Sequence, residues 1–137
     1  MNTAIFPSLG KYRDVGLLVL RIGLGAMFIL HGYPKMMGGP EQWAELGQAV
    51  SNVGIHGGYP VWGFLAAFAE FGGGILLILG LFTRVAALLL LGTMIVAAAT
   101  HLARGDGVTG ASHAIEAASV FFGLLFLGPG RHSIDRR

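Results

Sequence analysis

The stretch "PVWGFLAAFAEFGGGILLILGLF", residues 60–82, is the part of the sequence that decides the fold. Glu70 is its only ionisable side chain, and every other residue in it is apolar or glycine. A helix needs roughly 20 such residues to cross the hydrocarbon core of a membrane. The stretch therefore predicts a membrane-spanning helix that contains one carboxylate.

The composition of the whole chain favours a membrane protein. Of the 137 residues, 54% are hydrophobic and 12% are charged, and the mean hydropathy is +0.70. A soluble domain has about 25% charged residues. The chain has no cysteine, which excludes disulfides, thiolate metal sites and thiol redox chemistry within it. The net charge of +2 is too small to suggest nucleic acid as a partner.

The predicted fold is all-α, a polytopic four-helix membrane bundle that forms a single domain over residues 1–137. Each long apolar run is close to the length needed to span a bilayer, and the last run could begin a few residues earlier. Only about Thr83–Arg84 separates the second helix from the third, so these two are expected to form a tight antiparallel hairpin. The predicted spans are residues 15–33, 60–82, 84–103 and 112–128.

The distribution of Lys and Arg predicts the orientation of the bundle. With the N-terminus inside, the cytoplasmic segments hold six of these residues, and the outer loops hold only Lys35 and Arg104. An excess of positive charge marks the cytoplasmic side, so both termini are predicted to be cytoplasmic. The six are Lys11, Arg13, Arg84, Arg131, Arg136 and Arg137.

The first outer loop is long enough to contain a short amphipathic helix. Pro40 suits the first turn of a helix, and Glu41 and Glu45 lie near its start. Two arrangements are open: a helix on the outer membrane surface with Trp43 at headgroup depth, or a cap over the end of the bundle. Its expected apolar face consists of Trp43, Leu46, Val50 and Val53.

Glu70 is expected to face other helices and not lipid. At 100° per residue, it shares a stripe with small residues that allow a neighbouring helix to approach closely. Arg21 lies on a similar stripe of the first helix, and we predict an inward-facing Arg21–Glu70 pair, with a structural or a functional role. The second-helix stripe is Gly63, Ala66, Ala67, Glu70, Gly73 and Gly74, and the first-helix stripe is Arg21, Gly25, Phe28, Gly32 and Lys35.

A second polar group is predicted at the outer end of the bundle. Antiparallel threading brings His31, His101, His113 and Glu116 to the same side, with Lys35 and Arg104 just above them. The polar stripe of the fourth helix is expected to face inward. The histidines are interpreted as interfacial side chains bonded to loop carbonyls. They are also the candidates for a metal or haem site, although no His-x-x-x-His or Glu-x-x-His spacing supports one.

In this order along the chain, three motifs resemble the DoxX family of small four-helix bacterial membrane proteins. The first helix carries "LRIGLGAMFILHGYPKM", the second and third carry "AEFGGGILLILGLFTRVAALLL", and the end reads "GPGRHSID". "ASHAIE" departs from the family pattern, which often has Gly-Gly-x-Glu before the acidic residue, so His113 is particular to this chain. The resemblance covers nearly everything after residue 15. The positions it carries over are Arg21, His31, Lys35, Glu70, Arg84, Glu116 and Asp135.

The resemblance implies a subunit in the bacterial plasma membrane that belongs to a quinone-linked or oxidative-stress-related oxidoreductase system. The inward polar groups Arg21, Glu70, His31, Lys35, His101, His113 and Glu116 would then bind a quinone or similar lipid-like ligand, or relay its proton. The chain has no flavin or nicotinamide fingerprint, so any enzyme role would be that of a non-autonomous subunit. The alternatives are a non-catalytic anchor for another protein or a small transporter. The small stripes favour a homo-oligomer or a bound redox partner protein.

Overall fold

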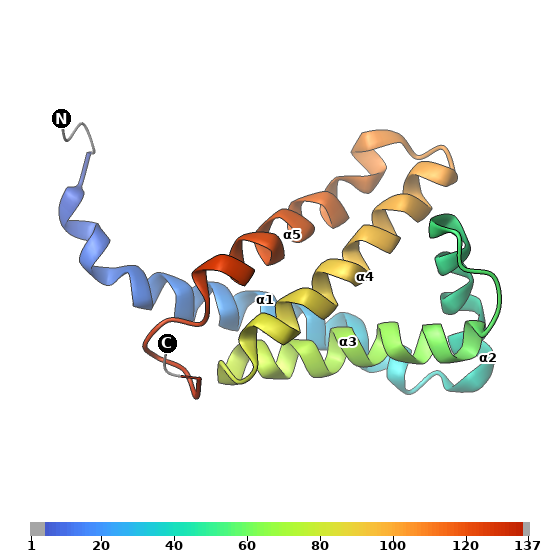
Figure 1. The fold of residues 1–137 in the computed structure, drawn as a ribbon, viewed down its shortest axis with the longest axis horizontal. Helices are drawn as coiled ribbons and strands as arrows, with labels where there is room; N and C mark the ends of the chain where they lie inside the picture. The colour runs from blue at the N-terminus through green and yellow to red at the C-terminus, as the bar shows by residue number, and fades with distance from the viewer. Residues whose placement is uncertain (1–4, 136–137) are drawn as a thin grey trace.

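The computed structural model of the chain describes residues 5–135. Over these residues the elements are all helical, as the sequence predicts (Figure 1). In chain order they are η1 (Pro7–Tyr12), α1 (Arg13–Met36), α2 (Gly39–Gly47), η2 (Gln48–Val53), α3 (Tyr59–Leu79), α4 (Thr83–Ala103) and α5 (Gly107–Leu127).

Four of these helices, α1, α3, α4 and α5, are long and apolar enough to cross a membrane, which confirms the predicted fold class. Their limits follow local backbone chemistry. Gly80 ends α3 with a positive φ of 66°, a conformation that glycine adopts at little cost. The turn into α4 is therefore residues 80–82, and Thr83 and Arg84 already belong to α4. Helix α5 begins at Gly107, five residues before the predicted span.

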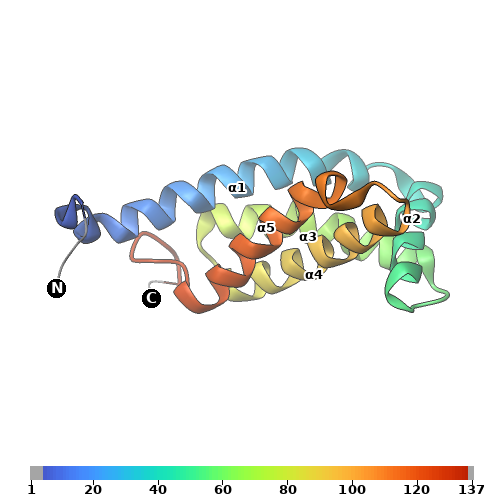
Figure 2. The same ribbon diagram turned by 90° about the horizontal axis from the view of Figure 1, so that it is seen from above.

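The helices form two antiparallel pairs, α1 with α3 and α4 with α5 (Figures 1 and 2). The first and last described residues, 5 and 135, lie toward one end of the molecule, which we call the terminal end. The other end, called the loop end, carries α2, η2 and the α4–α5 turn. Toward the loop end, α4 and α5 lean away from α3, and η2 packs between α3 and α4.

The predicted stripes of small residues are the places where helix backbones approach each other. A Cβ atom added at Gly25 would lie 2.6 Å from the carbonyl oxygen of Gly74, and one added at Gly32 would lie 2.4 Å from the backbone nitrogen of Phe71. Only glycine allows these separations, so α1 and α3 make backbone contact along much of their length. Glu70 is buried within the contacting face of α3, as the stripe predicts.

The predicted loop helix is α2 followed by η2, and it packs against the bundle. Gly63 of α3 lies against the backbone of Trp43, and Gly47 of α2 lies against the backbone of Tyr59. The indole nitrogen of Trp43 donates a hydrogen bond to the carbonyl oxygen of Lys35, at 3.0 Å. Of the two arrangements left open by the sequence, the structure therefore has the cap.

Candidate functional site

The buried Glu70 pairs with Lys35 and not with Arg21. The Lys35 ammonium lies 3.0 Å from both carboxylate oxygens of Glu70. Glu70 itself is only 5% exposed. The backbone contact of Gly32 with Phe71 sets this register. Lys35 lies one turn beyond Gly32 on the same stripe of α1, so its side chain reaches back to Glu70.

The predicted Arg21–Glu70 pair is therefore wrong. Arg21 is fully buried, and its guanidinium donates hydrogen bonds to the carbonyl oxygens of Leu77 and His132. Because α1 and α3 are antiparallel and touch at Gly25 and Gly74, Arg21 is level with the last turn of α3 and lies well below Glu70. The two buried charges belong to separate layers of the bundle.

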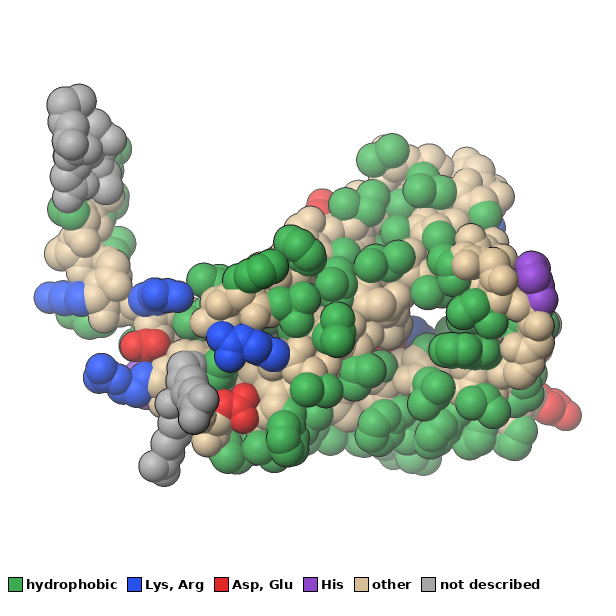
Figure 3. All heavy atoms as spheres, in the orientation of Figure 1, with side chains coloured by type: hydrophobic (Ala, Val, Ile, Leu, Met, Phe, Trp, Pro, Cys, Tyr) green, Lys and Arg blue, Asp and Glu red, His purple; other side chains and the backbone are tan. Residues whose placement is uncertain are grey.

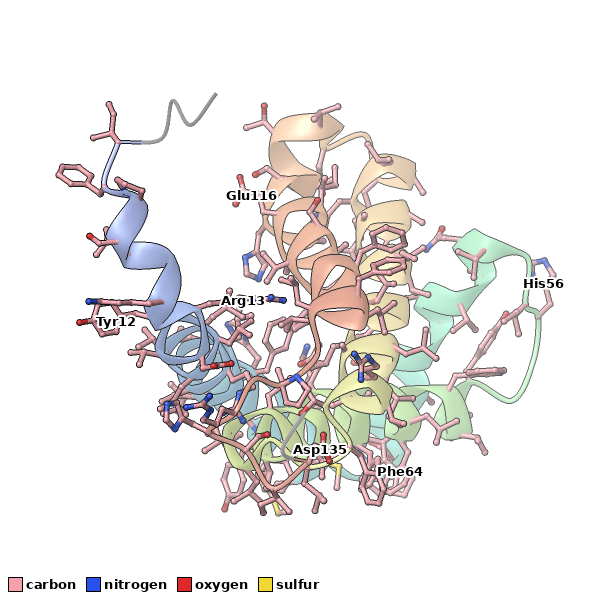
Figure 4. The ribbon with its side chains drawn as sticks, turned by 60° about the vertical axis from the view of Figure 1, so that its left-hand side comes forward. Tyr12, Arg13, His56, Phe64, Glu116 and Asp135 are labelled. Carbon is pink, nitrogen blue, oxygen red and sulfur yellow. The ribbon has the colours of Figure 1, made fainter. Side chains whose placement is uncertain are left out.

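Arg21 belongs to a cluster that fastens residues 128–135, called here the C-terminal strap, across the terminal end. Asp135 accepts hydrogen bonds of 2.9 Å from the backbone N–H groups of Phe82 and Thr83, and so caps the start of α4 (Figure 4). The N–H of Arg131 donates to Asp14 at 3.0 Å. Arg84, predicted as an interfacial anchor, donates to the carbonyl oxygen of Leu125. These residues hold the fold together.

The charge state of Asp135 predicts how the strap responds to acid. Burial by itself raises the pKa of Asp135, but hydrogen bonds from Thr83 and Phe82 and the charge of Arg21 outweigh it, so the pKa lies below its ordinary 3.8. Because the pKa of Asp135 is lower in the folded state than in the unfolded state, its ionised form stabilises the fold at any pH above the unfolded-state pKa. This stability is lost as the pH falls through the folded-state pKa. We expect hydrogen exchange at the Ile134 and Asp135 amides, corrected for intrinsic rates, to stay equally protected from pH 7 to pH 5. Protection should fall only below about pH 3.8.

Asp135→Ala should lower this protection at every pH, by about 0.5–2 kcal/mol, as is typical of a lost helix cap. Loss of protection between pH 7 and pH 5 in the unchanged chain would contradict the assignment of Asp135 as the titrating group.

A large pocket lies between α3, α4 and η2, and the Lys35–Glu70 pair forms part of its wall. Its volume is about 910 Å³, and it contributes to the hollow at the loop end in Figure 3. The hydrogen bond of 3.0 Å from Asn52 to the Thr100 hydroxyl joins η2 to α4 at its rim. The apolar wall includes Trp62, Leu65, Phe68, Leu88, Leu89 and Gly92, and the polar wall includes Lys35, Asn52, Glu70, Thr100, His101 and Arg104.

The predicted cluster of histidines with Glu116 is divided between two faces. His101 lies beside the pocket and pairs with Asp106 at 2.9 Å. His31 and His113 contact each other elsewhere, with ring centroids 6.0 Å apart. Glu116 is exposed and points away from the other helices, so the expectation that this stripe of α5 faces inward is wrong. Between residues 5 and 135 there is no group of three or more His, Cys, Asp or Glu side chains suited to a metal ion.

Sequence reasoning missed the pocket residues Asn52, Trp62, Gly92 and Thr100. They come from three different elements, and no residue spacing within a single element indicates that these side chains line one pocket. Lys35 was identified as polar and inward-facing, but its partner was not. The available signal was its place on the Arg21 stripe, one turn beyond Gly32.

The family model described as DoxX matches residues 16–103. The chain is 34% identical to the inner membrane protein YphA of Escherichia coli K12, over an alignment that covers 100% of both chains. It is 33% identical to the inner membrane protein YqjF of the same organism, over 92% of this chain and 94% of that one. An uncharacterized protein of Haemophilus influenzae is 35% identical, over 95% and 96%. No solved structure matches the chain significantly. With four apolar helices and relatives of the inner membrane, the chain belongs to the DoxX family of membrane proteins.

Proposed function

We propose that this chain binds a lipid-like molecule with a polar carbonyl head, such as a quinone, in the pocket between α3, α4 and η2. The observation that carries the proposal is that the ion pair of Lys35 with the buried Glu70 lies in the wall of an otherwise largely apolar pocket of about 910 Å³. Pockets for small ligands are mostly apolar and contain a few polar groups that orient the ligand. Trp62, Leu65 and Phe68 offer an apolar surface to a ring or an isoprenoid tail.

The ion pair suits the recognition of a carbonyl oxygen. An ammonium group has three N–H donors, and Glu70 accepts two hydrogen bonds from Lys35. The third donor can be given to a ligand carbonyl, while the two hydrogen bonds to Glu70 hold the ammonium in place. The Lys35 side chain is 34% exposed, so the ammonium is accessible from the pocket.

In this proposal the chain is a subunit that holds the quinone, and a partner oxidoreductase carries out the electron transfer. The chain has no cysteine and no flavin or nicotinamide fingerprint, which fits a role in binding and positioning. The excess of Lys and Arg in the segments at the terminal end favours that end on the cytoplasmic side of the bacterial inner membrane. Arg136 and Arg137, which are part of this count, lie outside the described residues.

Gly92 provides a direct test of ligand binding. It lies in the pocket wall, and a Cβ atom added there would have no neighbour within 4 Å, so a larger side chain fills space without disturbing the core. We expect quinone to copurify with the unchanged chain from native membranes, and Gly92→Leu to lower its occupancy roughly tenfold. Quinone is measured by extraction, chromatography and absorbance, per mole of protein.

The matched control is Gly16→Leu, because Gly16 is equally open but lies on α1 away from the pocket. It should leave the bound quinone unchanged. Equal quinone in all three proteins, or recovery of phospholipid alone, would overturn the proposal and favour the anchoring role.

A further inference from the structure

The exposed face of α5 carries a carboxylate that nothing in the described part of the chain neutralises. Glu116 is the tenth residue of the helix Gly107–Leu127, so it lies close to the middle of a membrane span. Its side chain points away from the neighbouring helices (Figure 4). No residue between 5 and 135 donates a hydrogen bond to it or forms an ion pair with it. A carboxylate facing lipid at this depth is costly, so membrane proteins bury such groups against protein.

The surroundings of Glu116 combine an acid with two bases. His113 lies three residues earlier on the same face of α5, about 4.5 Å nearer the loop end. The ring of His31 on α1 lies 6.0 Å from that of His113, and both histidines are exposed. One exposed face therefore holds a hydrogen-bond acceptor and two imidazole groups at nearly the same depth.

The same face of α5 can be approached closely by another helix. Ser119 and Gly123 continue it toward the terminal end, and the Ser119 hydroxyl is already bonded to the carbonyl oxygen of Ile115. A Cβ atom added at Gly123 would have no neighbour within 4 Å, so no contact among residues 5–135 requires a glycine there. Small residues on a membrane helix favour contact with a second helix.

We infer that this face, defined by His31, His113, Glu116, Ser119 and Gly123, is the contact surface for a second copy of the chain. A two-fold axis along the membrane normal leaves the depth of every residue unchanged. In such a dimer, Glu116 of each copy therefore differs in depth by only about one helical turn from the imidazole groups of the other. The surface is complementary to itself because it carries both the acid and its bases. A different protein would have to supply a matching base at the same depth. None of the five residues of this face lines the pocket.

The absence of native cysteines allows a direct test by cross-linking. Single cysteines are introduced at Ser119 and, as a control, at Ile95, which is also exposed near the middle of a span but on α4. Native membranes are treated with a short bis-maleimide. We expect Ser119→Cys to give a product of twice the chain mass, and Ile95→Cys to give none. A cross-linked Ser119→Cys product of any other mass would overturn the inference. So would finding only monomer, both after cross-linking and in native mass spectrometry from lipid discs.

The role of Glu116 is tested by measuring dimer association in lipid by fluorescence energy transfer at increasing dilution. Glu116→Leu should weaken association roughly 3- to 30-fold, as expected for loss of polar contacts between membrane helices. Glu41→Leu, a change at an exposed carboxylate outside the spans, should have no effect. Gly123→Phe is a second variant, which blocks helix approach without removing the charge. Unchanged association in both Glu116→Leu and Gly123→Phe would show that the copies meet elsewhere and refute the assigned surface.

Discussion

Replacing Lys35 by methionine is expected to lower the free energy of unfolding by roughly 3–5 kcal/mol. Methionine keeps the length of the side chain but leaves the Glu70 carboxylate buried in the α1–α3 contact without a cation. The penalty is that of an unpaired charge in a medium of low dielectric constant. It can be measured by titrating the protein from mild detergent into sodium dodecyl sulfate while following the fluorescence of Trp43 and Trp62.

The double variant identifies the partner of Glu70. Lys35→Met combined with Glu70→Leu should recover most of the stability, because it replaces both charges with apolar groups of similar size. Arg21→Leu combined with Glu70→Leu should instead be additive within about 0.5 kcal/mol, since Arg21 bonds to other groups. Lys11→Met, which removes an exposed cation stacked on Tyr12, should cost less than about 1 kcal/mol. Non-additivity of the Arg21 pair, with additivity of the Lys35 pair, would restore the pairing first predicted from sequence.

The second large effect is expected at Gly25. A side chain there would meet the backbone of α3, because the Cβ position lies only 2.6 Å from the carbonyl oxygen of Gly74. Gly25→Val should therefore separate α1 from α3 and lower the free energy of unfolding by about 3 kcal/mol. The same detergent titration measures it.

Gly23 on the same helix is the matched control. Nothing lies within 4 Å of its Cβ position, so Gly23→Val should change the stability by less than about 1 kcal/mol, the range of helix propensity. Equal costs at the two positions would mean that the close approach of α1 and α3 does not contribute to stability.

The sequence predicts the four spanning helices well because each is a long apolar run, and a helix satisfies the backbone hydrogen bonds of such a run within the segment itself. The stripes of small residues likewise predict which faces of α1 and α3 meet. The partner of Glu70 could not be predicted, since it depends on a shift of a few residues between two helices whose contacts are set by Gly25 and Gly32.

The orientation of α5 was predicted wrongly for a different reason. Its polar stripe was assigned to the interior because charged residues in a membrane usually face protein. The alanines Ala111, Ala114 and Ala117 are buried instead, together with Phe121 and Leu124, because they pack closely against α4. In a span this rich in alanine, hydropathy distinguishes the two faces poorly. The pocket was not predicted, because it depends on the angle at which α4 leaves α3.

The C-terminal strap also bears on how the chain is made. Arg21 and His132, one of its two acceptors, are 111 positions apart in the sequence, so the acceptor is translated long after the arginine. Asp135, the cap of α4, is added later still. Until residue 132 is translated, Arg21 therefore lacks one of its two carbonyl acceptors, and translation of the four spans alone does not supply it. A chain that stops before residue 132 therefore lacks both this acceptor of Arg21 and the Asp135 cap of α4.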